Sequence, residues 1–204
     1  YKLYWLESLN KKLKTLLKSK RIKSQEFKLV FSKSEALESA LTKLGNKIKS
    51  AVKKGNVLIH LIEEMPGDNM LSINALIATG YIHQQLINEG LRTDANIIVS
   101  TASARDTHSI ACLISYGATA VYPWLAFQSI LDLTNKGELK GSPTENCAKY
   151  RKGINKGLLK IISKIGISTI SSYRGSQLHE IVGLDDEVVD KCFSKFDTLM
   201  LCTL

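Results

Sequence analysis

The segment STASARDTHS, at residues 100–109, gathers several hydroxyl groups and one guanidinium. With the first N–H groups of a helix that begins here, such side chains could hold an anion. The candidates for this anion site are Ser100, Thr101, Ser103 and Arg105. A plainer interpretation is that Ser103, Asp106 or Thr107 caps the helix, because short polar side chains are preferred at a helix N-terminus. We favour capping and keep the anion site as the alternative.

The other reactive side chains show no pattern of a known site. No serine or cysteine nucleophile motif accompanies His108, so we interpret it as a packed or solvent-facing histidine. His60 lies in an apolar run and is expected in the core, and Cys112 is expected to be a small buried hydrophobe. The four cysteines include no CxxC pair, which argues against zinc and iron–sulfur motifs. A disulfide framework is not expected in a chain of this size and apolar content. We predict no catalytic residue and no metal site.

Four lysines are spaced four residues apart, which places them on one face of a helix. They are Lys152, Lys156, Lys160 and Lys164. The row could bind phosphate, but isoleucines and leucines occupy the other side, as in an amphipathic helix outside an α/β layer. Gly153 and Gly157 do not form a phosphate-binding loop, whose lysine follows the second glycine; we expect them to admit a neighbouring backbone. The lysines are therefore predicted to face water.

Alternating strands and helices are predicted to position these residues. Short apolar runs indicate strands at 56–62, 96–100, 118–122 and 167–171, and FKLVF at 27–31 is compatible with a short strand. Helical spacing predicts helices at about 35–54, 72–88, 105–116 and 145–165, each ending near a glycine, with a looser helix after Pro123. Ser32 and Glu35 have capping-box spacing before the first of these.

This alternation predicts the α/β fold class with parallel strands. In such folds ligands bind beyond the carboxyl ends of the strands, which is where residues 100–109 are expected. The turn-rich segment NKGELKGSPTE, at 135–145, is the candidate domain boundary.

Composition limits the class of protein. The chain has 204 residues and a net charge of +9, and residues 1–54 hold 15 of its 28 Lys and Arg but four of its 19 Asp and Glu. We interpret residues 1–31 as a basic helical segment with few aromatic residues, so nucleic acid is an unlikely partner. No apolar run could span a membrane and no signal peptide is evident. A cytoplasmic protein is expected.

Three segments carry a resemblance to a known family. They are TASARDTHSIA, YGATAVYPWLAF and YRKGINKGLLKIISKIGISTISSYRGSQLHE. They resemble the large subunit of bacterial glutamate synthase, over about residues 34–193. The residues of the first two segments are more similar to the NADPH-type than to the ferredoxin-type enzyme. The resemblance implies the end of the family's central domain at 32–135 and the start of its FMN-binding β/α barrel at 145–204.

The family forms glutamate from glutamine and 2-oxoglutarate, using FMN, an iron–sulfur cluster and a small NADPH-oxidising subunit. The family's catalytic and cluster-binding motifs have no counterpart in these residues. The resemblance therefore implies a fragment that is inactive alone and binds no cofactor alone, with the remainder of the large subunit and the small subunit as partners. The candidates to face the flavin are Ser171, Ser172, Tyr173 and Arg174. A non-catalytic binding or scaffold module with a basic N-terminal segment is the alternative.

Overall fold

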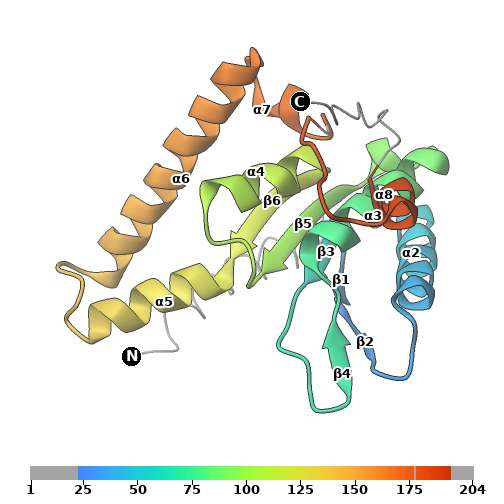
Figure 1. Cartoon of the computed structure of the whole chain (residues 1–204), viewed down its shortest axis with the longest axis horizontal. Helices are drawn as coiled ribbons and strands as arrows, with labels where there is room; N and C mark the ends of the chain where they lie inside the picture. Colours follow the sequence, from blue (N-terminus) through green and yellow to red (C-terminus); the bar gives the residue numbers. More distant parts are fainter. Residues whose placement is uncertain (1–22, 177, 194–204) are drawn as a thin grey trace.

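A four-stranded parallel sheet with strand order β1-β3-β5-β6 forms the centre of the molecule (Figure 1). The computed structural model describes residues 23–176 and 178–193, so most of the predicted basic helical segment at 1–31 lies outside the described residues. The strands are β1 (Ser24–Lys28), β3 (Leu58–Ile62), β5 (Asn96–Thr101) and β6 (Ala118–Pro123). The predicted α/β class with parallel strands is confirmed, and the sheet is open within the described residues.

Helices connect the parallel strands, as crossover connections require. They are α2 (Leu37–Lys53), α3 (Ala75–Asn88), the 3-10 helix η1 (Arg92–Asp94) and α4 (Thr107–Ser115). The apolar stripe that predicted α2 is buried, with Ile48 fully covered. The central strands β3 and β5 are mostly apolar along their length because both faces of each strand are buried. Their fully buried side chains are Ile59, Leu61, Ile97 and Val99.

Two features near the start of the described chain differ from the prediction. Segment 27–31 divides between β1 and a strand β2 (Val30–Ser32), which pairs antiparallel with β4 (Met70–Ser72). The three-residue β4 was not predicted, because a strand that short shows no periodicity. The expected capping box of Ser32 and Glu35 is wrong: Ser32 belongs to β2, its hydroxyl contacts Ser34, and α2 begins after Ala36 without a side-chain cap.

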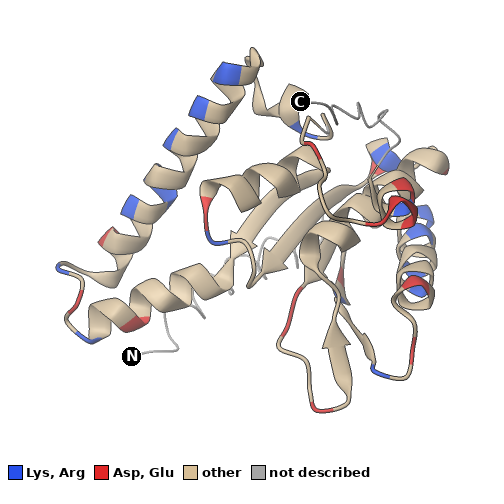
Figure 2. Cartoon of the chain, in the orientation of Figure 1, with Lys and Arg blue, Asp and Glu red and all other residues tan. Residues whose placement is uncertain are grey.

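Two helices follow the sheet, α5 (Trp124–Asn135) and α6 (Pro143–Ile165), which pack against each other. Ser142 and Glu145 form a capping box at the start of α6, and Gly166 ends it with a φ of 80°. The four lysines at 152, 156, 160 and 164 are all exposed, so their predicted position on the wet face is confirmed. Figure 2 shows basic residues following one another along this helix. No helix in the described residues is long and apolar enough to cross a membrane.

The glycines of α6 differ in their surroundings. A Cβ on Gly157 would lie 2.6 Å from the side chain of Thr107, whereas a Cβ on Gly153 would meet nothing within 4 Å. The expected close approach therefore occurs at Gly157 alone, and a side chain at the start of α4 makes it rather than a backbone.

The predicted strand at 167–171 is wrong. These residues lead into a short helix α7 (Ile170–Tyr173), and Thr169 caps it by accepting a hydrogen bond from the Ser172 amide. The Thr169 hydroxyl also lies within 3.0 Å of the hydroxyls of Ser171 and Ser172. Such local hydrogen bonds compete with pairing in a sheet, and this competition explains the error.

A last helix, α8 (Asp186–Cys192), packs against α3 at Gly80. A Cβ at Gly80 would lie 2.3 Å from the backbone oxygen of Cys192 and 3.0 Å from the Phe193 ring. We expect Gly80→Ala to lower the free energy of unfolding by about 1–3 kcal/mol, because α8 must move away from α3. Urea denaturation would measure this. The control Gly153→Ala makes the same change in open space on α6, and should stabilise the chain by about 0.5–1 kcal/mol. Equal effects of the two substitutions would contradict the packing of α8.

Candidate functional site

The carboxyl ends of β3, β5 and β6 lie side by side at one edge of the sheet. Ile62 pairs with Ser100, and Ser100 pairs with Tyr122, so the residues that follow each strand meet there. This is the edge at which parallel α/β folds bind ligands. It is therefore the first place to look for a functional site.

A buried carboxylate, that of Glu63, occupies the centre of this edge. It accepts hydrogen bonds from the Thr101 hydroxyl, from the Ala102 amide at 2.9 Å and from the Ser103 amide at 3.2 Å. The Ser103 hydroxyl, at 3.1 Å, is a further donor. The Glu63 carbonyl accepts a hydrogen bond from the Trp124 indole at 3.1 Å. Glu63 thus ties the end of β3 to the loop after β5 and to the start of α5.

The residues predicted as an anion site mostly have partners inside the protein. Thr101 and Ser103 bind Glu63, and Ser100 Oγ lies 2.7 Å from His60 Nε2. Arg105 is exposed, and its carbonyl accepts a hydrogen bond from Tyr150. The donors that could hold an external anion are directed at the protein's own carboxylate. Binding of an external anion here stays a prediction, and it would require Glu63 to leave.

Capping of α4, the interpretation that we favoured, is confirmed. Asp106 is the N-cap residue, and its Oδ1 accepts a hydrogen bond from the Ser109 amide at 2.7 Å. That bond to the charged form lowers the pKa of Asp106 below its usual value. The carboxylate also lies at the positive end of the helix dipole, which stabilises it.

The expected core position of His60 is confirmed, since the residue is 5% exposed. Its Nδ1 lies 3.8 Å from a carboxylate oxygen of Glu26, beyond hydrogen-bond distance. Burial lowers the pKa of His60, and the nearby Glu26 partly opposes this. The ring is therefore favoured in its neutral form and serves as a packing residue with one polar contact.

Glu63 was missed as a site residue because its partners are about 40 positions away in the chain. The sequence does carry one usable signal. Glu63 follows directly after a buried strand, and the polar segment 100–103 ends the neighbouring one. A carboxylate placed beside hydroxyls and free amides at the same sheet edge is a natural hydrogen-bond partner for them.

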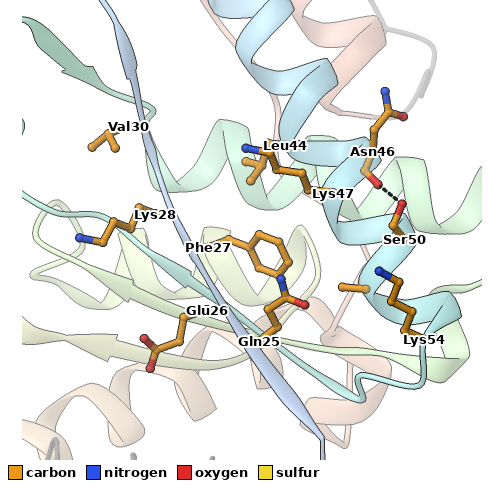
Figure 3. A pocket seen from close by; sticks show the side chains of 11 residues that line it. Gln25, Glu26, Phe27, Lys28, Val30, Leu44, Asn46, Lys47, Ser50 and Lys54 are labelled. Carbon is orange, nitrogen blue, oxygen red and sulfur yellow. Dashed lines mark hydrogen bonds between the residues drawn. The ribbon is translucent and has the colours of Figure 1, made fainter.

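The outer edge of the sheet, at β1, borders a hollow of about 740 Å³ between β1 and α2 (Figure 3). Three lysines, Lys28, Lys47 and Lys54, and one acid, Glu26, line it together with the ring of Phe27. Lys28 already pairs with Glu64 at 2.9 Å. In the described residues β1 pairs with β3 alone and is the edge strand of the sheet. An edge strand is a place where further chain can add to a sheet.

The four candidates in the turn after α6 have different surroundings. Tyr173 is fully buried, and its hydroxyl lies 3.0 Å from His179 Nε2. Ser171 and Ser172 are exposed and share their hydroxyls with Thr169. Arg174 is also near the surface, with Nη1 donating to the Thr119 hydroxyl at 3.4 Å. The four side chains do not converge on one space.

The model of the glutamate synthase central domain matches residues 6–185. The chain belongs to this family. The large chain of the NADPH enzyme from Bacillus subtilis is 39% identical over 173 residues, covering 85% of this chain and 11% of the relative. The corresponding chain from Azospirillum brasilense is 41% identical over 160 residues, covering 78% of this chain and 11% of the relative.

A ferredoxin-dependent glutamate synthase from Pyropia yezoensis is 42% identical over 155 residues, covering 70% of this chain and 10% of the relative. NADPH and ferredoxin relatives are thus similar to the chain to the same degree. The chain spans about a tenth of the length of these relatives. The matched stretch also runs across the predicted domain boundary at 135–145, so the division into two domains stays a prediction.

The cofactors that the glutamate synthase family implies can be tested against the residues present. An iron–sulfur cluster requires about four cysteine thiolates that converge. The cysteines of the described segments, Cys112, Cys147 and Cys192, are buried on three different helices and are free. They do not fit a cluster. The turn at 171–174 does not fit FMN as a set either, because Tyr173 is enclosed and the two serines are bound to Thr169.

Proposed function

We propose that the chain works as the central domain of a glutamate synthase large chain. In that setting the complete enzyme transfers the amide nitrogen of glutamine to 2-oxoglutarate and reduces the product to glutamate. The match of residues 6–185 to the family carries the proposal. The location that follows from it is the cytoplasm.

The geometry favours a structural contribution to that reaction over a catalytic one. At the edge of the sheet where a ligand would bind, the Glu63 carboxylate already accepts hydrogen bonds from the amides and hydroxyls at the end of β5 and in the loop after it. A carboxylate that accepts hydrogen bonds from this many groups of its own protein is held in place and has few lone pairs left for a substrate. The domain would therefore hold its neighbours in position, while FMN and the iron–sulfur cluster bind elsewhere in the enzyme.

The partners follow from the same proposal. The remainder of the large chain would pack against the hollow beside β1, where Lys47 and Lys54 offer positive charge to an acidic surface. A small reductase subunit would complete an enzyme that takes its electrons from NADPH. NADPH is preferred to ferredoxin as the electron donor only because the sequence segments are more similar to the NADPH-type enzyme.

The test has two parts. The purified 204-residue chain should show no flavin absorbance and no glutamine-dependent formation of glutamate from 2-oxoglutarate. In a chimera, this chain should replace the matched stretch of the Bacillus subtilis large chain and retain measurable glutamate synthesis with its small subunit.

A chimera that folds and carries its flavin but forms no glutamate would contradict the proposal, as would stoichiometric FMN on the isolated chain. Salt-sensitive binding of DNA or RNA that disappears when the lysines at 11–23 are neutralised would instead support a separate binding module.

A further inference from the structure

Two potential metal ligands lie one turn apart on α4. His108 and Cys112 are four residues apart, so their side chains lie on the same face of the helix. The distance from His108 Nε2 to Cys112 Sγ is 3.6 Å. A tetrahedral zinc ion with Zn–S of about 2.3 Å and Zn–N of about 2.0–2.1 Å separates N and S by about 3.6 Å. The observed pair already has that separation.

A third ligand comes from the segment that follows α7. The ring of His179 stands edge-on to that of His108, with centroids 5.7 Å apart and an interplanar angle of 84°. One ligand atom from each of His108, Cys112 and His179 lies within 4.8 Å of the others. The described residues contain no other group of three such side chains this close together.

The protein holds His179 in position independently of any ion. Tyr173 Oη lies 3.0 Å from His179 Nε2, and the Tyr116 hydroxyl donates to the His179 carbonyl at 3.2 Å. With Tyr173 on Nε2, an ion would have to bind the other ring nitrogen, Nδ1. Metal-binding histidines commonly have one ring nitrogen held in this way, which fixes the orientation of the ring.

The surroundings allow an ion to enter. His108 is exposed and His179 is half-buried, while Cys112 lies beneath them and is 8% exposed. The carboxylate of Asp106, at the N-cap of the same helix, adds negative charge close to His108. A thiolate with two imidazoles is a ligand set that suits zinc, a borderline-soft cation, and does not suit magnesium or calcium.

We propose that His108, Cys112 and His179 bind one Zn²⁺, with water as the fourth ligand. The ion would fasten the segment between α7 and α8 onto α4, and so join the end of the described chain to the sheet. Neither the family nor the role proposed above requires this site, so the two proposals can fail separately.

The test uses the full 204-residue chain without a histidine tag, stripped of metal with a chelator. Titration with Co²⁺ should produce a thiolate-to-cobalt charge-transfer band that saturates at one ion per chain and disappears on adding Zn²⁺. Mg²⁺ should have no effect. At a free Zn²⁺ concentration of about 100 times its Kd, the melting temperature should rise by about 5–10 °C.

Variants assign the site. Cys112→Ala should abolish the band, while the matched control Cys147→Ala, at another buried cysteine, should keep it. His179→Gln should weaken Zn²⁺ binding more than about 100-fold, and Tyr173→Phe, which removes only the bond to Nε2, by about 10-fold. Circular dichroism would check the folding of each variant. If Cys112→Ala fails to fold, the His179 variant and the cobalt spectrum still decide. Absence of the band in the wild-type chain, or its persistence at full strength in His179→Gln, would overturn the proposal.

Discussion

Replacing Glu63 by alanine should lower the free energy of unfolding by about 3–4 kcal/mol. Glu63 is 9% exposed, and its carboxylate accepts hydrogen bonds from two amides and two hydroxyls at the end of β5 and in the loop after it. Truncation removes the shared acceptor of these donors, of which the Thr101 hydroxyl is fully buried and the others partly buried. Each group left unsatisfied costs about 1–3 kcal/mol before the loop relaxes. Urea denaturation of the purified chain would measure the loss.

The neighbouring acid is a matched control. Glu64 pairs with Lys28 at 2.9 Å on the surface, so Glu64→Ala should cost less than about 1 kcal/mol. Glu63→Gln keeps one acceptor oxygen and should lie between the two. Equal losses for Glu63→Ala and Glu64→Ala would show that the carboxylate does not organise this edge of the sheet.

Acid should destabilise the chain through His83. This histidine is buried on α3, and its Nδ1 accepts a hydrogen bond from Arg92 Nε at 2.8 Å. The same guanidinium donates to the carbonyls of Ala95 and Gly117. Burial, followed by the charges of Arg92 and Arg174, lowers the pKa of His83 to about 4. Protonation would remove the acceptor and place a third positive charge beside two others.

The sign follows from proton binding. The unfolded chain takes up a proton on His83 near its usual pKa of about 6.5, whereas the folded chain resists protonation until about pH 4. The stabilisation is complete above pH 6.5 and is lost as the pH falls from 6.5 to 4. It amounts to about 3 kcal/mol over that interval.

The measurement is the free energy of unfolding of wild type and of His83→Gln at several pH values from 7.5 to 4. Other groups titrate in this range, so the difference between the two proteins isolates His83. The wild type should lose about 3 kcal/mol more than the variant. Parallel curves would show that His83 has an ordinary pKa in the folded chain.

Local patterns predicted most of the framework because the forces behind them act between near neighbours. Apolar runs located β3, β5 and β6, and helical spacing located α2, α3, α4 and α6 to within a few residues. The lysines of α6 face water because the apolar side of the same helix packs inward, a relation contained within 23 residues. Membership of the family was also visible in the sequence, since long similar segments need no tertiary information.

The errors have two causes, a pairing with a distant segment and a local hydrogen bond that competes with strand pairing. β4 exists because β2 pairs with it, and neither strand is long enough to indicate the pairing. Residues 167–171 have the apolar and β-branched composition of a strand, but the hydroxyl of Thr169 caps α7 and no strand of the sheet pairs with them in the described residues.

The contacts between the polar and potentially metal-binding side chains also depend on the tertiary structure. By itself the sequence determined an α/β framework, a row of solvated lysines, a capped α4 and kinship with glutamate synthases. Only the fold brought Glu63 to the loop after β5, and His179 to His108 and Cys112. Spacing along the chain reports contacts within one helix or strand, whereas these groups meet because separate elements end at the same place.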